Sequence, residues 1–291
     1  MEDIEKWIRA GKITAQAREY AKAIAKPGIS YVELADKIEA KIKELGAKPA
    51  FPVNLSADAT AAHDTAFPED DRILKDQLLK IDIGAQIDGC CGDTAVTVDL
   101  SGKYGRLIEA AEKALEEAIE VVNQEGTLGE IGAVIEKTIT SFGYQPVRNL
   151  SGHGIKPYEV HSKPTIPNFN TGEKTKLSRS QVIAIEPFAT TGAGMIQEKG
   201  DASIFSQSGN AAGRTMSARQ IVKAAQLYNK LPFASRWLPF SKGVLALGIR
   251  DLKRLRTLRA YPPLVEVDNG MVAQAEHTLI LTEDEIIVST K

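Results

Sequence analysis

The sequence predicts an α+β fold made of two related halves, in each of which two helices precede a set of strands. Three observations predict it. Helical spacing of apolar residues is followed by strand-like sequence twice, the two stretches align with each other, and a basic stretch interrupts the second half. The 291 residues, 43% of them hydrophobic and 25% charged, are enough for one large domain or two ordinary ones with a sizeable core.

The first half begins with two predicted helices. Apolar residues recur at helical spacing before Pro27 and Gly28, at Ile4, Trp7, Ile8, Ile13, Ala17, Ala21 and Ile24. Ser30 and Glu33 have the spacing of a capping box, so they predict the start of a second helix, which ends at Gly46. Strand-like sequence follows over residues 51–55, 78–88 and 94–100.

The same order of elements returns in the second half, with helices predicted over about 104–123 and 128–142 and strands over 147–155 and 181–188. A shift of 97 positions aligns six identities in a window of seventeen: Glu33 with Glu130, Ile38 with Ile135, Glu39 with Glu136, Ile42 with Ile139, Gly46 with Gly143 and Pro49 with Pro146. Amphipathic helices resemble one another by pattern alone. The matching Gly and Pro lie in the turns, however, and they favour a duplicated half-domain.

A basic stretch breaks this symmetry. Residues 214–260 contain eleven Lys or Arg and a single acid, Asp251. Helices are predicted over 216–230 and 249–260, separated by a segment that contains proline. Because strands resume over 264–268, 271–281 and 284–290, the stretch is interpreted as an insertion.

Bulk properties exclude several classes of protein. A net charge of -2 gives no overall attraction to nucleic acid or anionic membrane. No apolar run approaches the roughly 18 residues of a membrane span, and the charged N-terminus has no apolar signal region. The two cysteines, Cys90 and Cys91, are adjacent and cannot join distant segments. We therefore expect a cytoplasmic protein that does not bind a membrane. Separately, we expect a monomer.

Two aspartates define the first part of a candidate metal site. Asp82 alternates with apolar residues in a predicted strand, and Asp88-Gly89 predicts a hairpin turn before Asp93. Facing carboxylates repel each other, and bound cations remove that penalty. Taken singly, each acid is explained as well by an exposed strand residue or by a distant arginine partner.

Glu186, Glu276 and His153 extend this site. Both glutamates lie in apolar strand sequence, where an uncompensated charge is costly, and no Lys or Arg lies within five residues of either. His153 stands between two glycines, which allow close approach of a ligand. Such a donor set suits Mn, Fe, Co or Zn. Thiolate ligation by Cys90 or Cys91 is a less favoured alternative.

These residues and their surroundings resemble the pita-bread metallopeptidases of family M24, and within them the archaeal type II methionine aminopeptidases. The resemblance covers residues 49–70, 80–98, 149–161, 185–195 and 275–281, with the ordered set Asp, Asp, His, Glu, Glu. It implies a pseudo-twofold pita-bread fold around a curved antiparallel sheet. It also implies a catalytic domain of residues 1–206 and 262–291 and a winged-helix-like helical insertion of residues 207–261.

The resemblance further implies a site with two divalent ions, of Co, Mn, Fe or Zn. Its ligands are Asp82, Asp93, His153, Glu186 and Glu276, of which Asp93 and Glu276 bridge both ions. Glu186 would also transfer protons. His161 would hydrogen-bond the oxyanion and His63 the next amide, so both would contact substrate. Phe51, Val160, Ile204 and Tyr261 would line the pocket for the methionine side chain. His277 follows a ligand on a strand, points to the opposite face and is interpreted as structural.

The activity implied is removal of the N-terminal methionine from nascent polypeptides, preferably when the next residue is small. Two alternatives stay open. An Xaa-Pro aminopeptidase or prolidase shares the ligand order but usually carries an extra N-terminal domain, whereas only 81 residues precede Asp82. A binding module that has lost its metals would lack several ligands. The basic insertion is either a solvated cap or a ribosome-binding surface that includes Arg254, Arg256 and Arg259.

Overall fold

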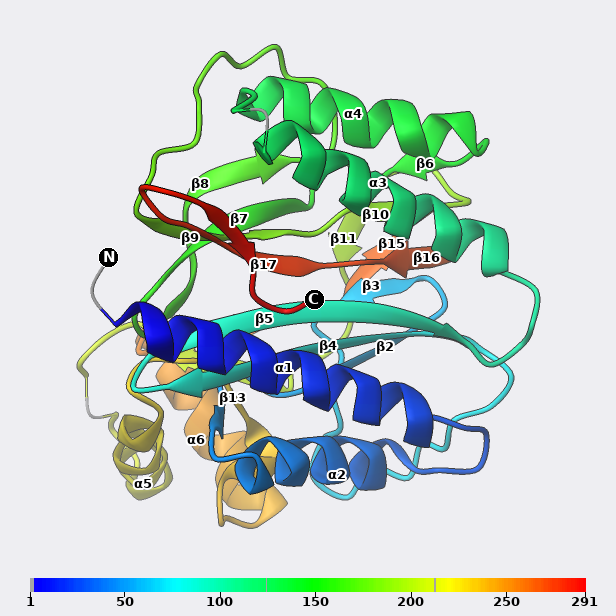
Figure 1. Ribbon diagram of the computed structural model, residues 1–291. Helices are drawn as coiled ribbons and strands as arrows, with labels where there is room; N and C mark the ends of the chain where they lie inside the picture. Colours follow the sequence, from blue (N-terminus) through cyan, green and yellow to red (C-terminus); the bar gives the residue numbers. More distant parts are fainter. Residues whose placement is uncertain (1–2, 124, 212) are drawn as a thin grey trace.

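A computed structural model describes residues 3–123, 125–211 and 213–291. The helices of this part of the chain are α1 (Ile4–Ile24), α2 (Tyr31–Glu44), α3 (Gly105–Asn123), α4 (Leu128–Ser141), α5 (Met216–Ala225) and α6 (Lys242–Arg254), with 3-10 turns η1 (Gln226–Tyr228) and η2 (Ser235–Trp237). Helices α1 and α2 lie on one side of the sheets and α3 and α4 on the other (Figure 1). None of the helices in the described ranges is long and apolar enough to cross a membrane.

Two larger sheets occupy the middle of the molecule, and all of their strand pairs are antiparallel. The first contains β1 (Lys48–Pro49), β4 (Leu78–Ile87) and β2 (Asn54–Ala57), in that order, with β5 (Cys90–Asp99) also paired to β4. The second has the order β18 (Ile286–Val288), β17 (His277–Leu281), β9 (Gln181–Ile185), β7 (Ser151–Lys156), β8 (Glu159–Pro167).

Three small antiparallel sheets complete the described strands. They have the orders β16 (Val272–Gln274), β10 (Phe188–Thr190), β6 (Gln145–Pro146); β11 (Ile196–Glu198), β15 (Leu264–Glu266), β3 (Thr60–Ala62); and β13 (Phe233–Ala234), β12 (Ile204–Gln207), β14 (Leu258–Tyr261).

The predicted duplication is confirmed by the positions of the elements. Helices α2 and α4 begin and end 97 residues apart, as do the short strands β1 and β6. Both helices have a hydroxyl N-cap: the Ser30 Oγ accepts a hydrogen bond from the Glu33 amide at 3.1 Å, and the Thr127 Oγ1 accepts one from the Glu130 amide at 3.2 Å. The repeated turn and cap residues therefore specify the same structure twice.

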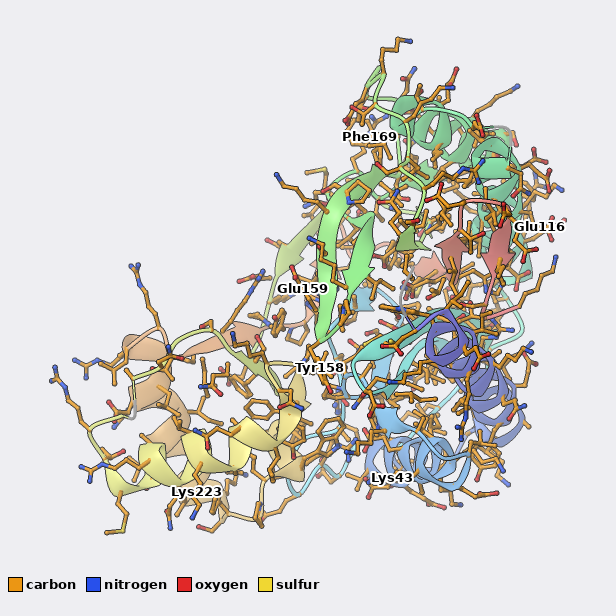
Figure 2. The ribbon with its side chains drawn as sticks, turned by 60° about the vertical axis from the view of Figure 1, so that its left-hand side comes forward. Lys43, Glu116, Tyr158, Glu159, Phe169 and Lys223 are labelled. Carbon is orange, nitrogen blue, oxygen red and sulfur yellow. The ribbon has the colours of Figure 1, made fainter. Side chains whose placement is uncertain are left out.

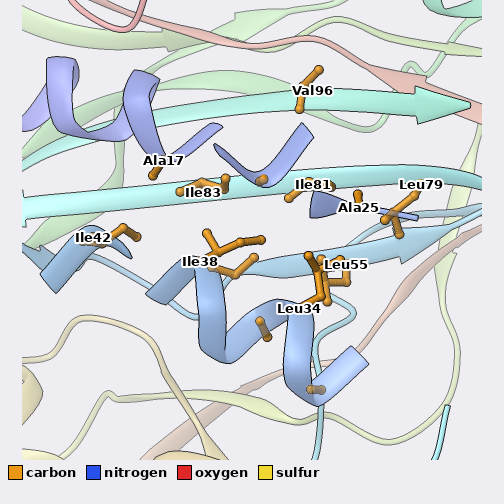
Figure 3. Close-up of a cluster of buried hydrophobic side chains, with 14 of the residues drawn as sticks. Ala17, Ala25, Leu34, Ile38, Ile42, Leu55, Leu79, Ile81, Ile83 and Val96 are labelled. Atoms are coloured by element: carbon orange, nitrogen blue, oxygen red, sulfur yellow. The ribbon is translucent and has the colours of Figure 1, made fainter. Parts of the chain in front are cut away.

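Each helix pair buries its apolar face against its own strands. Leu34, Ile38 and Ile42 of α2 pack with Ile81 and other residues of β4 in one buried cluster, shown in Figure 3. Helices α3 and α4 form the equivalent cluster with strands of the second half. Burial of each large apolar side chain stabilises the fold by about 1.5–3 kcal/mol. This packing attaches each helix pair to the strands of its own half.

The turn between β4 and β5 has the geometry that its sequence predicts. Asp88 and Gly89 have φ values of 50° and 90°, and they join the paired residues Ile87 and Cys90. Positive φ at both central residues is typical of a type I′ hairpin turn. This turn fixes the register that carries Asp82 and Asp93.

The insertion differs in part from its prediction. The helix predicted over 216–230 corresponds to α5 and η1. The prediction of a helix over 249–260 is wrong after residue 254. Helix α6 ends at Arg254, Arg256 has a φ of 54°, and the next residues form β14, which pairs with β12. The left-handed residue turns the chain, and strand pairing overrides the helical spacing.

The insertion has a core of its own and projects from the body of the molecule in Figure 2. Phe205 of β12 and Phe233 of β13 belong to this core, together with apolar residues of α5 and α6. The predicted boundary at residue 207 falls on the last residue of β12, so the sheet of the insertion begins before it.

A buried polar contact anchors the insertion to α2. Glu39 is 4% exposed and accepts hydrogen bonds from the Arg236 guanidinium and, at 2.8 Å, from the Trp237 indole nitrogen. Arg236 also contacts Asp36 at 2.6 Å. Burial raises the pKa of Glu39, an effect that Arg236 opposes. The pairing satisfies a carboxylate that would otherwise be costly to bury.

We expect Gly11→Ala to destabilise the protein, because α1 approaches the C-terminal segment too closely for a side chain. A Cβ on Gly11 would lie 2.5 Å from the Cβ of the buried Ser289. Overpacking of this kind costs about 1–3 kcal/mol. Gly105→Ala in the equivalent helix α3 is the control, since nothing lies within 4 Å of its Cβ. Urea denaturation measures both, and equal stability of the two variants would contradict the proposed contact.

Candidate metal centre

The predicted site residues converge on one cavity of about 250 Å³ between the two halves. It is lined by ten of the eleven residues singled out from the sequence, which are Phe51, His63, Asp82, Asp93, His153, His161, Glu186, Ile204, Tyr261 and Glu276. The eleventh, Val160, does not line this cavity and packs in a buried apolar cluster with Phe51. Neighbouring residues of a strand point to opposite faces, which is consistent with Val160 being buried while His161 lines the cavity.

The two aspartates come from the β4–β5 hairpin. Asp82 is opposite Ala95 and Asp93 is opposite Gly84, so both carboxylates lie on the same face of the hairpin, offset by two residues along the strands. Gly84 leaves room for Phe51, whose Cδ1 lies 2.7 Å from the position of an added Cβ. The hairpin therefore presents two carboxylates to the cavity and places an aromatic ring beside them.

The second half supplies the remaining donors. His153 lies on β7, Glu186 directly follows β9, and Glu276 lies between β16 and β17. The His153 Nε2 is 3.8 Å from the Asp93 Oδ2 and 3.7 Å from the Glu186 Oε1. Ligand atoms of Asp93, His153 and Glu276 all lie within 4.8 Å of one another. Residues nearly two hundred positions apart thus form one cluster able to hold a cation.

Carboxylate oxygens in this cluster lack other partners. Oδ1 of Asp82 and Oδ1 of Asp93 are buried and accept no hydrogen bond within the described part of the chain. Glu186 accepts one from the Gln274 Nε2 at 3.3 Å. Buried polar atoms are ordinarily paired. Carboxylate oxygens with one imidazole suit a divalent ion of intermediate hardness, so the residues fit the metal that the sequence predicts.

The carboxylates oppose one another in electrostatic terms. Burial raises the pKa of Asp93, Glu186 and Glu276 well above the ordinary value, and the charges of neighbouring carboxylates raise these pKa values further. Burial also raises the pKa of Asp82, to about 7. Like charges held this close favour the protonated form unless a cation compensates them.

The three histidines of the cavity have lowered pKa values. Burial lowers the pKa of His63 and of His153 to about 3 and that of His161 to about 4, with a further contribution to His161 from Arg259. The His153 Nδ1 lies 3.2 Å from the Gly154 carbonyl oxygen, which assigns the proton to Nδ1. The lone pair of Nε2 then faces Asp93 and Glu186, as a metal ligand requires.

Threonine hydroxyls join the two halves at the acids. The Thr278 Oγ1 accepts a hydrogen bond from the Asp93 amide at 2.8 Å and donates one to the Asp93 carbonyl at 2.7 Å. On the other side, the Thr94 Oγ1 donates to the Glu276 carbonyl at 2.7 Å. Strands β5 and β17 lie side by side in Figure 1. These side chains, together with the backbone hydrogen bond from the Glu276 amide to the Ala95 carbonyl at 3.2 Å, fix Asp93 relative to Glu276.

The remaining candidates from the sequence lie outside the cavity; they are Cys90, Cys91 and His277. Cys90 and Cys91 pack in the apolar cluster, and burial raises the pKa of Cys90 to about 11. His277 faces away from the acids, and its Nδ1 lies 2.9 Å from the Thr290 Oγ1. Arg18 contacts both His277 and Thr94. These contacts hold Thr94 and His277, which directly follow Asp93 and Glu276 in the sequence.

Sequence reasoning missed several residues of the cavity. Asn54 lines it and accepts a hydrogen bond from the His63 amide at 2.8 Å, which holds His63 at a positive φ of 63°. Arg259 also lines it, although the sequence analysis placed Arg259 on the surface of the insertion. Gln274 does not line the cavity, but its amide donates a hydrogen bond to Glu186 there. It precedes Glu276 by two positions, and this alternation was the available signal.

Comparison with known proteins agrees with this geometry. The model of metallopeptidase family M24 matches residues 5–283. A methionine aminopeptidase of Pyrococcus abyssi is 46% identical over 294 aligned positions, which cover 99% of this chain and 100% of that protein. The chain therefore belongs to metallopeptidase family M24.

Solved structures share the fold. A methionine aminopeptidase from Thermotoga maritima superposes with a TM-score of 0.72 at 24% identity, and the match covers 99% of this chain and 96% of that chain. A thermophilic Arx1 superposes with a TM-score of 0.85 at 18% identity, covering 99% and 91%. At these identities the likeness concerns the fold, which confirms the predicted pita-bread architecture.

We expect Thr278→Val to weaken the junction between the halves. The substitution removes both hydrogen bonds to Asp93 and leaves its buried amide unpaired, which costs about 1–3 kcal/mol. Thr140→Val is the matched control, because its hydroxyl donates to the Glu136 carbonyl on an exposed helix face. Denaturation and Mn²⁺ titration measure both variants. Unchanged stability and unchanged Mn²⁺ affinity in Thr278→Val would show that the hydroxyl does not fix Asp93.

Proposed function

We propose that this protein is a metal-dependent aminopeptidase that removes the N-terminal methionine from nascent polypeptides, preferably when the next residue is small. One observation carries the proposal. Asp82, Asp93, His153, Glu186 and Glu276 line one cavity, with buried carboxylate oxygens that lack a partner in the described structure. The archaeal relatives named methionine aminopeptidase, matched over the whole chain, support the substrate.

We propose that these five residues hold two divalent ions, of Co, Mn, Fe or Zn. When bound, such ions lower the pKa of a water molecule and polarise a carbonyl oxygen. The chain itself supplies the positions. Threonine hydroxyls hydrogen-bond the backbone of Asp93 on β5 and of Glu276 just before β17, and ligand atoms of the two carboxylates lie within 4.8 Å of each other. The neutral imidazole of His153 offers Nε2 between Asp93 and Glu186.

Glu186 and two further side chains carry the proposed chemistry. Glu186 accepts the proton of the attacking water and passes it to the leaving amine, a role supported by its position beside His153 and its hydrogen bond from Gln274. His161 and His63 are neutral and donate N–H groups to the developing oxyanion and to the next amide. The ring of His161 lies 4.5 Å from that of His153, next to the proposed centre.

The side chain of the first residue would occupy the apolar part of the cavity. Phe51, Ile204 and Tyr261 line it, together with Phe188 and Leu264. A side chain without charge, such as that of methionine, is suited to this surface. The Xaa-Pro alternative is not favoured, because the relatives matched over the whole chain are named methionine aminopeptidases.

Peptide turnover before and after chelation tests the function. We expect release of methionine from Met-Ala-Ser-amide, loss of release by at least tenfold after chelation, and recovery with Mn²⁺ or Co²⁺. A Gly-Pro-Ser peptide, with proline second, is the control for the Xaa-Pro alternative. Asp93→Asn should abolish release and the rise in melting temperature on adding Mn²⁺, whereas Asp284→Asn on the exposed surface should change neither. Folded protein with no activity under any metal would support a binding module instead.

We also propose that the basic insertion contacts ribosomal RNA, which would place the enzyme beside emerging polypeptides in the cytoplasm. Arg250, Lys253 and Arg254 are exposed on α6 and form no ion pair within the described structure. Arg259 lines the cavity and is unsuitable for testing this surface. These exposed positive charges attract the phosphate groups of RNA, and added salt weakens that attraction.

Charge reversal on α6 tests the RNA contact. The Lys253→Glu/Arg254→Glu variant is expected to lose ribosome sedimentation at 50–100 mM salt, on the order of tenfold, while retaining peptide turnover. Reversal of Lys113 and Lys137 on α3 and α4 is the control for general charge. Ribosome binding equal to that of the unmodified protein would contradict a role for this face.

A further inference from the structure

A second depression, of about 480 Å³, opens beside the metal-centre cavity. We call it the outer depression. It shares four lining residues with the inner cavity, which are His161, Pro232, Arg259 and Tyr261. Its other walls are residues 157–160 of the β7–β8 hairpin and residues 229–230 after η1. Figure 2 shows Tyr158 and Glu159 at the end of that hairpin, next to the insertion.

The outer depression carries an excess of positive charge. Arg259 and Lys230 line it from the insertion, and Glu159 lines it from the hairpin. All three side chains are exposed. The ion pairs of the insertion, within the described ranges, are formed by Arg236 with Asp36 and Glu39. Two cations and one acid therefore remain available to a ligand.

Arg259 is held at the junction of the two hollows. Its guanidinium lies 5.1 Å from the ring centroid of Tyr261. The Tyr261 hydroxyl lies 2.9 Å from the Ser206 Oγ, and its ring contacts His63 at a centroid distance of 5.6 Å. The charge of Arg259 contributes to the lowered pKa of both His161 and His63. Arg259 thus stands within electrostatic reach of both histidines.

The shape of the two hollows gives a path for the substrate. An aminopeptidase holds the first residue at its metal centre, so the following residues leave through an open side of the cavity. The side formed by His161, Arg259 and Tyr261 leads directly into the outer depression. Tyr158, Asn229 and Lys230 there have φ values of 60°, 49° and 70°. Strained backbone of this kind is frequent where a chain forms a binding surface.

We propose that the outer depression binds the third and fourth residues of the substrate and favours a carboxylate there, through Arg259 and Lys230. This inference rests on the proposed aminopeptidase function. The carboxylate is either an acidic side chain at these positions or the free C-terminus of a tripeptide. Interactions between exposed charges are weak, and salt screens them. We therefore expect a modest preference for substrates with a carboxylate at these positions.

Three amidated peptides test the preference, Met-Ala-Glu-Ser, Met-Ala-Gln-Ser and Met-Ala-Lys-Ser. We expect kcat/KM to be about two- to fivefold higher for the Glu peptide than for the Gln peptide, and lower still for the Lys peptide. The preference should shrink at 0.5 M salt. Met-Ala-Gln with a free C-terminus, compared with its amide, separates the terminal carboxylate from the side chain.

Charge variants assign the effect to the outer depression. Arg259→Gln and Lys230→Gln should each lower the Glu-to-Gln ratio toward one, and Glu159→Gln should raise it. Lys223→Gln, on the exposed face of α5, should leave the ratio unchanged. A ratio near one in the unmodified protein, with methionine still released, would overturn the inference. Absence of methionine release from all peptides would instead refute the proposed function on which it rests.

Discussion

Four carboxylates in one buried cavity are the constraint on which the rest of this structure depends. Burial raises the pKa of all four, and the charges of neighbouring carboxylates raise the pKa of Asp93, Glu186 and Glu276 further. A chain does not bring such groups together for stability, since unpaired buried charge is costly. The fold must therefore hold them in place with other interactions until a cation compensates their charge.

Those interactions come from the duplicated architecture. The first half contributes Asp82 and Asp93 on one hairpin, and the second contributes His153, Glu186 and Glu276. Neither half holds a complete donor set. Their apolar clusters lie on the outer sides, each beneath its own pair of helices. The polar junction between the halves includes threonine hydroxyls that hydrogen-bond the backbone of Asp93 and Glu276, beside a backbone hydrogen bond from the Glu276 amide to the Ala95 carbonyl. Apolar packing beneath the helices therefore stabilises the fold, and the carboxylates lie in the cavity between the halves.

The sequence predicted what depends on local chemistry. Ser30 and Thr127 cap helices, Asp88-Gly89 turns the hairpin, and the matched glycines and prolines place the same turns in both halves. What escaped prediction depends on contacts between distant residues. The hydroxyl of Thr278 pairs with Asp93 across 185 positions, and β14 forms only because β12 offers it a partner. The family resemblance marks Val160 as a residue of the methionine pocket and His161 as a substrate contact, but Val160 on β8 is buried in the apolar core.

The insertion completes the cavity that the two halves begin. Ile204, Pro232 and Tyr261 form part of its wall, yet they belong to segments whose sheet and core lie in the insertion. Their position relative to the acids depends on the contact of Arg236 and Trp237 with Glu39 on α2. Glu39 also accepts a hydrogen bond from the Val53 amide, next to Asn54, which holds His63. One buried carboxylate therefore joins the wall of the cavity to the backbone that carries a histidine of the site. A polar contact suits this purpose because its geometry admits few alternatives, whereas apolar packing alone would allow the wall to shift.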